Sequence, residues 1–383
     1  MSLSSSRPAA SPDVCAVIHE RASWKGRSFY IWSMPTHRTV LLATLAVAGL
    51  VSCSAHTPAI VTIAPASGER HLSNIRQLTN GGENAEAYFS SDGQRLIFQS
   101  TRDGRTCDQE FVMNIDGSGL HRVSTGSGKT TCGFFYENDQ RILFGSSHAE
   151  QQDCPPKPDP SKGYVWRLDP YDIYTARPDG SELHRLTNYG VYTAEGVVSP
   201  NGKTLVFTSL KDGDLDIYTM NVDGSNLKKL TTTPGYDGGP WWSPDGTKIV
   251  YRAWHPVGDS LTVYRDLLAQ RLVRPNKMEL WVMNADGSDQ HQITHLGGAN
   301  FGPSWTPDGK RLIFSSNYRQ PRSGNFDLFM VNLDGSGLEQ ISTEETFDGF
   351  PMFSPDGKKL VWASNRHDAK FGETNLFLAD WNP

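Results

Sequence analysis

A phrase of residues that recurs six times constrains the fold of this chain more than any other feature of its sequence. Each copy has an apolar or aromatic pair, then Ser-Pro-Asp-Gly or a variant of it, then a basic residue and an apolar triplet. Successive copies begin 46, 63, 44, 63 and 48 residues apart, which indicates a repeat of about 45 residues with insertions in the second and fourth copies. The copies begin at Tyr88, Phe134, Val197, Trp241, Ser304 and Met352.

Each repeat carries the turn signals that four short strands need. A second phrase ends in Asp-Gly, and such pairs supply the positive-φ residues of two-residue hairpins. Four short strands within one such period form one blade of a β-propeller. We therefore predict an all-β chain, folded as a six-bladed β-propeller of four-stranded blades. In the fourth repeat the predicted strands are residues 236–242, 248–252, 279–283 and 290–294.

The ends of the repeat region predict how the ring closes. The sixth repeat ends near Trp381 without an outer strand, whereas residues 74–79 match outer strands such as residues 227–231. We expect this N-terminal strand to complete the last blade, because a ring closed in this way leaves no exposed edge. The insertion of the fourth repeat, residues 253–278, predicts one short helix that Asp259 or Ser260 caps and that Pro275 stops.

These phrases resemble the TolB-like β-propeller repeat, and the resemblance covers residues 73–381. TolB carries an α/β domain before its propeller, and we expect this chain to lack that domain, because the segment before the first strand is short. The propeller of TolB binds a peptidoglycan-associated lipoprotein, so the resemblance implies an envelope protein of that type as a partner. The repeats are also similar to those of oligogalacturonate lyase.

The N-terminal region is typical of an export signal. Residues 39–50 are an apolar run too short for a membrane-spanning helix, and Leu50-Val51-Ser52-Cys53 resembles the lipobox of bacterial lipoproteins. We expect lipidation at Cys53 and a location on the periplasmic side of the bacterial cell envelope, at the outer membrane, held by the lipid anchor only. The predicted segments are a misassigned or untranslated leader at 1–33, a lipoprotein signal peptide at 34–52, a flexible tether at 53–72 and the propeller at 73–383.

Composition and missing motifs narrow the function. A formal charge of −6 argues against nucleic acid as a partner, because a phosphate-binding surface needs an excess of basic residues. The chain has no GxSxG, HExxH or CxxC motif, so the sequence favours a protein that is not an enzyme. We expect a monomeric binding or scaffold lipoprotein that recognises an envelope protein or an envelope glycan. The alternative is a metal-assisted polysaccharide lyase or hydrolase that resembles oligogalacturonate lyase.

Candidate binding residues come from the face of the ring where irregular loops gather, since loops on a rigid scaffold usually carry recognition. Both insertions, residues 146–170 and 253–278, fall on this face. One polar position recurs at the start of every inner strand, and we expect its residues to surround the channel entrance. Their oxygens could hold Ca²⁺ or Mg²⁺ there, or they could bond only backbone and channel water. They are Asn84, Thr130, Thr193, Asp237, Asn300 and Asp348.

Further candidates depart from the repeat. Two acids, Glu86 and Glu195, follow the polar position by two residues in their blades. Arg252 replaces a small or polar residue, so it either pairs with acids at the mouth or presents a cation to an anionic ligand. The predicted binding residues are Asn84, Glu86, Glu195, Asp237, Arg252, His255, Asn300 and Asp348.

Three cysteines of the propeller, Cys107, Cys132 and Cys154, are predicted to lie near one another on the irregular face. A disulfide is expected in an envelope compartment, and either Cys132–Cys154 or Cys107–Cys132 would satisfy the spacing. The third thiol would then be free. A zinc site made from the three cysteines and His148 is the alternative.

Overall fold

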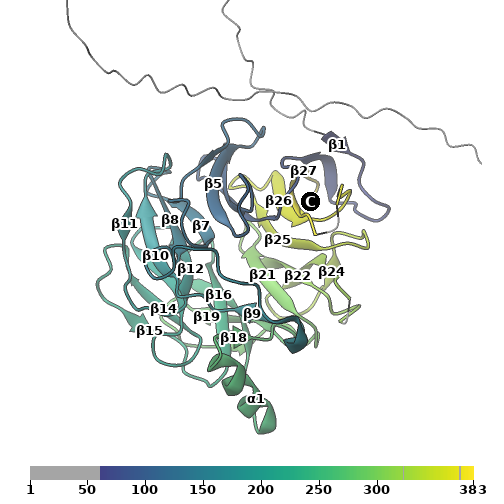
Figure 1. The fold of residues 1–383 in the computed structure, drawn as a ribbon. Helices are drawn as coiled ribbons and strands as arrows, with labels where there is room; N and C mark the ends of the chain where they lie inside the picture. Colours follow the sequence, from purple (N-terminus) through teal and green to yellow (C-terminus); the bar gives the residue numbers. More distant parts are fainter. Residues whose placement is uncertain (1–60, 322, 371) are drawn as a thin grey trace, which may run out of the picture. The chain divides into compact units, whose positions relative to one another are not determined.

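The computed structural model describes residues 61–321, 323–370 and 372–383, which form a ring of six antiparallel sheets. The predicted six-bladed propeller is confirmed, and the blades follow one another around the ring in chain order (Figure 1). The first three blades are β3 Asn84–Phe89, β4 Arg95–Ser100, β5 Gln109–Asn114 and β6 His121–Arg122; β7 Thr130–Tyr136, β8 Arg141–Ser146, β10 Asp172–Ala176 and β11 His184–Arg185; and β12 Thr193–Val198, β13 Thr204–Ser209, β14 Asp216–Asn221 and β15 Lys228–Lys229.

The other three blades have the same inner-to-outer order of strands. Blade 4 matches the strands predicted from its sequence, although its outer strand is shorter than expected. Blades 4 to 6 are β16 Tyr236–Trp242, β17 Lys248–Trp254, β19 Glu279–Asn284 and β20 His291–Gln292; β21 Asn300–Trp305, β22 Arg311–Ser316, β23 Asp327–Asn332 and β24 Glu339–Gln340; and β25 Asp348–Phe353, β26 Lys359–Ser364, β27 Asn375–Trp381, β2 Leu72–Gln77 and β1 Val61–Ile63.

The repeated phrase builds the turn between the first and second strands of a blade. In blade 4, Ser243 Oγ donates to Asp245 Oδ1 at 2.6 Å and accepts the Lys248 N–H at 2.9 Å. Gly246 then takes a φ of 71°, which favours glycine, and packs against Pro200 of the turn in blade 3. The phrase therefore closes its own turn, and in blade 4 it also contacts the turn of the preceding blade.

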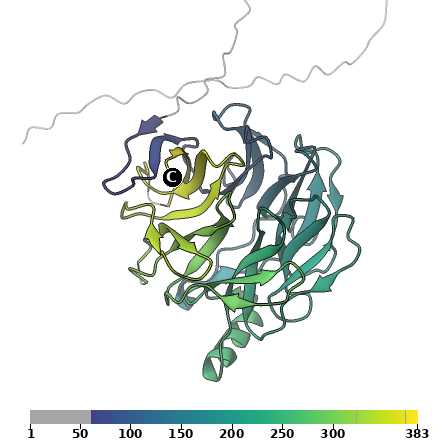
Figure 2. The ribbon, with the colours of Figure 1, turned by 180° about the vertical axis from the view of Figure 1, so that it is seen from behind.

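The ring closes as the sequence predicts. Strand β2 pairs with β27, so the N-terminal strand completes blade 6, and the purple and yellow ends of the chain lie side by side in both ribbon views (Figures 1 and 2). Beyond the prediction, β1 pairs with β2 and adds a fifth strand. The segment expected to be a flexible tether therefore contains a strand from Val61, because its backbone groups find a partner in β2.

A cluster of buried ion pairs also stabilises the closed ring. Glu69, just before β2, accepts hydrogen bonds from Arg366 Nη2 at 3.0 Å and Nη1 at 3.3 Å. Arg366 also donates to Asp348 at 2.9 Å, and the side chains of all three residues are inaccessible to solvent. The N-terminal segment is thus held to blade 6 by charge as well as by strand pairing.

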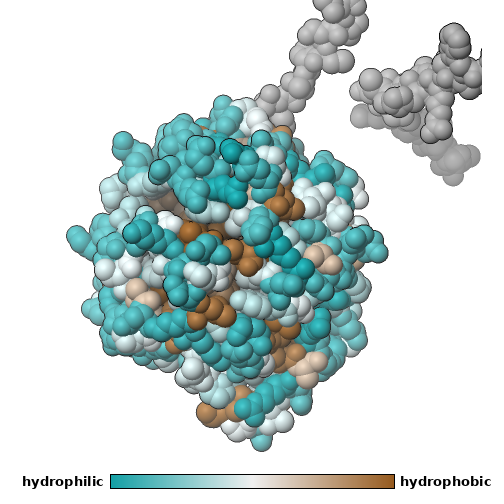
Figure 3. Space-filling view, turned by 90° about the vertical axis from the view of Figure 1, so that its left-hand side faces the viewer, coloured by the Kyte–Doolittle hydropathy of each residue, from teal (hydrophilic) through white to brown (hydrophobic). Residues whose placement is uncertain are grey.

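The two insertions meet on one face of the ring. The second-blade insertion contains a short 3₁₀ helix, η1 Pro160–Lys162, and β9 Trp166–Arg167, which pairs with β18 Leu272–Val273 of the fourth-blade insertion. The predicted helix is present as α1 Asp259–Leu268, but Gly258 occupies its N-cap position and no side chain caps it. In Figure 3, apolar surface lies on the part that projects at the bottom of the molecule. Val257, just before α1, is 81 % exposed.

Within the described residues, no helix has the length and apolar character that a membrane crossing requires. Cys53, the predicted leader and the predicted signal peptide lie outside the described residues.

Candidate functional site: the axial cavity

A backbone irregularity recurs in every inner strand, two residues after the recurring polar position. The pairing of the first and second strands shifts register there in all six blades, which is a β-bulge. The residue at the bulge has a left-handed backbone in each blade, with φ between 53° and 60°. These residues are Glu86, Cys132, Glu195, Gly239, Gly302 and Phe350.

Glycine occupies two of these positions for a steric reason. A Cβ on Gly239 would lie 2.8 Å from Arg252 Nη1, and one on Gly302 would lie 3.2 Å from the Phe350 ring. The other four positions hold side chains, although a left-handed backbone costs such residues about 1–2 kcal/mol each. Strain of this kind persists where the surrounding structure holds it, and it often marks a functional site. The ring of bulge residues is therefore a candidate functional site.

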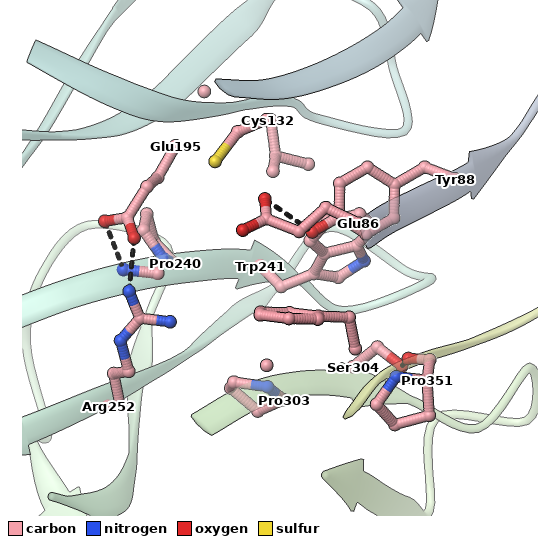
Figure 4. A pocket seen from close by; sticks show the side chains of 15 residues that line it. Glu86, Tyr88, Cys132, Glu195, Pro240, Trp241, Arg252, Pro303, Ser304 and Pro351 are labelled. Atoms are coloured by element: carbon pink, nitrogen blue, oxygen red, sulfur yellow. Dashed lines mark hydrogen bonds and ion pairs between the residues drawn. The ribbon is translucent and has the colours of Figure 1, made fainter. Parts of the chain in front are cut away.

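The bulge side chains form the neck of a cavity on the axis of the ring. Outside the neck, beneath the second-blade insertion, the cavity has a volume of about 370 Å³. Inside the neck it narrows to about 40 Å³, which is room for one to a few water molecules. Prolines and Trp241 line this inner part, as Figure 4 shows. The outer wall is largely aromatic, with Trp166, Tyr192, Tyr236 and Phe301 among its residues.

Arg252 and Glu195 form a buried ion pair at the neck. Arg252 Nη2 donates to Glu195 Oε1, and Nε donates to the Tyr236 hydroxyl at 2.9 Å. Glu195 Oε2 also accepts the Gly239 N–H at 2.9 Å. The guanidinium lies over the rings of Trp166 and Tyr236, with its carbon 5.1 and 5.6 Å from their centroids. Of the two predicted roles for Arg252, pairing with an acid is the one that the geometry shows.

Glu86 lies opposite this pair and has only neutral neighbours as hydrogen-bond donors. The Tyr88 hydroxyl donates to Glu86 Oε2 at 3.4 Å (Figure 4). Burial raises the pKa of Glu86, and the negative charge of Glu195 adds to the rise, while a hydrogen bond from Cys132 opposes it. The carboxyl group therefore holds its proton more tightly than an exposed glutamate does.

The cysteines pair differently from the prediction. Cys107 and Cys154 form the disulfide, with their Cα atoms 5.5 Å apart, so both predicted pairings through Cys132 are wrong. The reason is that the bulge turns Cys132 toward the axis, where its thiol is free. Burial raises the pKa of this thiol well above its ordinary value, and Glu86 and Glu195 raise it further. Cys107 and Cys154 are joined in the disulfide and offer no thiolate to a metal, which argues against the zinc site predicted from the three cysteines.

The polar residues at the start of the inner strands do not surround the channel, so their predicted placement is wrong. All six have 0 % exposure and none of them lines the cavity. The bulge two residues later turns the chain, so the residue at the bulge faces the axis and the strand start faces its own blade. Three of them bond a serine hydroxyl of the neighbouring strand: Asn84 accepts from Ser100 at 2.7 Å, Thr193 bonds Ser209 at 2.8 Å, and Asn300 accepts from Ser316 at 2.5 Å. The two acids pair with basic side chains, Asp237 with His255 at 2.9 Å and Asp348 with Arg366 at 2.9 Å.

The placement of the strand-start residues tests the predicted Ca²⁺ or Mg²⁺ site at the channel entrance. Most side-chain oxygens of the strand-start residues have partners within the protein, although Asp237 Oδ2 has none. No cluster of three or more His, Cys, Asp or Glu side chains suited to a metal occurs in the part of the chain that the structure describes. Asp237 and His255 form a pair away from the cavity, with His255 packed against Trp281. The residues present therefore do not fit Ca²⁺ or Mg²⁺ at the channel entrance.

Sequence reasoning found three cavity residues and missed others. Glu86, Glu195 and Arg252 line the cavity, as their predicted place at the mouth required. Cys132 and Phe350 occupy the same repeat position as the two acids, so the alignment of repeats could have identified them. Trp166 and Tyr164 come from an insertion whose sequence does not recur in the other blades, so no repeat signal points to them.

The fold and the cavity together define a propeller whose axial site opens beneath a cover made by two insertions. The family model described as TolB beta propeller domain matches residues 173–265 and 253–377, which together make up more than half of the chain. The chain therefore belongs to the TolB β-propeller family. Membership supports a binding or scaffold role, and the family is periplasmic.

Individual comparisons agree on the fold. The Tol-Pal system protein TolB of Nitratidesulfovibrio vulgaris is 42 % identical over 40 residues, a stretch that covers 10 % of this chain and only 9 % of that protein. The structure of putative TolB from Agrobacterium tumefaciens has a TM-score of 0.53 at 19 % identity, covering 79 % of this chain and 91 % of that one. An oligogalacturonate lyase in complex with manganese has a TM-score of 0.50 at 15 % identity, and the match covers 84 % of this chain and 96 % of that one. At such identities the structural likeness shows the fold alone.

Proposed function

We propose that this protein is a non-catalytic binding protein of the bacterial envelope, which receives a segment of a partner protein in its axial cavity. The observation that carries the proposal is the outer cavity of about 370 Å³, with aromatic walls and a few fixed polar groups. This size and composition are typical of sites that recognise ligands. Tryptophan and tyrosine, which form much of the wall, are also the residues most enriched among binding hot spots.

The charged groups of the cavity fit binding better than catalysis. A reaction that uses both a general acid and a general base needs two titratable groups in reach of the same substrate. Here Glu195 is neutralised by Arg252, and Cys132 is held as a thiol, so Glu86 is the one acid at the neck without a charged partner. No histidine is among the described residues that line the cavity. The metal-assisted lyase that we considered as an alternative would need ligands that this wall does not supply.

The proposal also includes the class of the partner and the location of the protein in the cell envelope. Family membership favours an envelope protein as the partner, of the peptidoglycan-associated lipoprotein type, and an envelope glycan is the other class. We propose that lipidated Cys53 anchors a monomer on the periplasmic side of the outer membrane. A lipid anchor keeps the propeller near partners that are themselves fixed to the envelope.

The test is affinity capture from cross-linked envelopes, with captured proteins identified by mass spectrometry. The native protein is compared with Trp166→Ala, which removes part of the cavity wall, and with Leu183→Ala, an apolar truncation in the turn before β11. Loss of a tryptophan hot spot weakens binding by about 2 kcal/mol or more, which is roughly thirtyfold. The proposal predicts a partner that the native protein and Leu183→Ala capture and Trp166→Ala loses. Equal capture by all three, with equal melting temperatures, would refute it.

A further inference from the structure

The balance of charge around the cavity is uneven. Three cations stand at its wall, and each has a carboxylate partner within 4 Å. Glu86 has no cationic partner within that distance among the described residues, and Figure 4 shows its carboxyl group in the middle of the cavity, opposite Arg252. The three paired cations are Arg252 with Glu195, Arg167 with Asp169, and Lys129 with Asp108.

Two polar groups are thus left to meet a ligand. Glu86 can accept hydrogen bonds from a donor, and an ionised carboxylate binds a cationic donor most strongly. Arg252 Nη1 has no acceptor among the described residues, and Figure 4 shows it directed into the cavity. It can therefore donate to a carbonyl oxygen of the same ligand.

The walls around Glu86 suit a compact cation on an apolar stem. Tyr88 and Trp241 lie against each other beside it, with ring centroids 4.9 Å apart, and their faces attract positive charge. The inner cavity of about 40 Å³ has room for an ammonium head, which is about the size of a water molecule. The wider outer cavity has room for a methylene stem and a stretch of backbone.

From these observations we propose that Glu86 receives the primary ammonium group of a lysine side chain, presented by the partner segment. The inference rests on the proposed function and adds the chemistry of the recognised residue. The ammonium head lies in the neck beside Glu86, the methylene stem extends into the outer cavity beside Phe350, and a backbone carbonyl of the partner accepts from Arg252 Nη1.

Binding of this kind is coupled to the ionisation of Glu86. The ammonium group pairs with the carboxylate form, so the ligand draws Glu86 into that form and a proton leaves. Affinity should therefore rise with pH until Glu86 is ionised in the empty protein, and then level off. The titratable and charged groups that act on Glu86 in the structure are Tyr88, Asp108, Glu110, Cys132, Glu195 and Arg252.

The experiment uses calorimetry and tryptophan fluorescence with blocked pentapeptides of sequence Ala-Ala-Xaa-Ala-Ala. The variable residue is lysine, Nε-acetyl-lysine, norleucine or arginine, and free 1,5-diaminopentane is a separate probe. We expect the lysine peptide to bind at least tenfold more tightly than each of the other probes. Glu86→Gln should remove this preference and also the rise of affinity with pH. Glu83→Gln, on the exposed surface of the same blade, should keep both.

The outcomes separate the two proposals. Equal binding of the lysine and norleucine peptides, no binding of the lysine peptide, or no effect of Glu86→Gln would overturn the lysine site. Diaminopentane binding as tightly as the lysine peptide would also overturn it, in favour of a free amine ligand. A captured partner that depends on Trp166 but shows no dependence on Glu86 would leave the proposed function standing alone.

Discussion

The buried ion cluster that contains Glu69 and Arg366 allows a prediction of how much a substitution lowers the free energy of unfolding. Glu69 accepts four N–H groups, two from Arg366 and one each from Ala66 and Thr343. Glu69→Ala leaves Arg366 buried with Asp348 as its remaining carboxylate and removes the acceptor of two backbone N–H groups. Breaking a buried ion pair costs about 3–5 kcal/mol, so we expect the free energy of unfolding to fall by that amount.

Two further variants show whether charge or shape is responsible. Glu69→Gln keeps the shape and one acceptor oxygen but loses the charge. It should therefore lower the free energy of unfolding by less than Glu69→Ala does, by about 2 kcal/mol. Glu83→Ala removes an exposed pair with Lys157, where the side chains are 57 % and 84 % exposed and 3.5 Å apart. Surface pairs of this kind contribute about 0–1 kcal/mol.

Urea unfolding followed by tryptophan fluorescence measures all three variants against the native protein. The ring should open at the seam between β2 and β27 in Glu69→Ala, so hydrogen exchange should rise first in those strands. If Glu69→Ala and Glu83→Ala lower the free energy of unfolding by amounts that agree within about 1 kcal/mol, strand pairing alone closes the ring. The reasoning about the buried charge would then be refuted.

Three other predictions concern the cysteines and one buried acid. Replacing Cys107 and Cys154 by serine should lower the free energy of unfolding by about 4 kcal/mol for a loop of 47 residues, measured in urea, while Cys132→Ser should change it by less than about 1 kcal/mol. Cys132→Gly should change stability by less than about 0.5 kcal/mol because it relieves the left-handed backbone, whereas Ala194→Gly, beside a bulge, should cost about 1 kcal/mol in the same assay. Burial, assisted by the charge of Asp348, raises the pKa of Asp327 to about 7, so stability should fall as pH rises from about 4 to about 7. Asp327→Asn should flatten this slope and unfold at a higher temperature than the native protein at pH 8; an unchanged slope would contradict the assignment.

The fold could be predicted from the sequence because its signals are local. The turn at Ser243–Gly246 closes through bonds among a few neighbouring residues, and the same residues recur in the other blades. The closing strand β2 was predictable for the same reason, since it repeats an outer-strand phrase. Strand β1 was not, because Val61–Ile63 has no counterpart among the repeats and is placed by its pairing alone.

The site was only partly predictable, and the β-bulge explains why. Alternation along an inner strand would place Asn84 and Glu86 on the same side, and the sequence analysis put both at the channel. The bulge breaks this alternation, so Asn84 bonds within its blade while Glu86 faces the axis. The pairing of Cys107 with Cys154 was out of reach for another reason: it depends on the path of an insertion that no other blade repeats.

The bulge also explains how a repeated scaffold produces a site with two unlike sides. All six blades supply the same left-handed position, but blades 1 to 3 fill it with Glu86, Cys132 and Glu195, whereas blades 4 to 6 fill it with two glycines and Phe350. One side of the neck is therefore polar and the other is open and apolar. A ring of six acids would repel itself, and a ring of six glycines would offer no side chain to a ligand. The uneven ring instead gives a bound segment one orientation, with its polar head toward β3, β7 and β12 and its apolar stem toward β21 and β25.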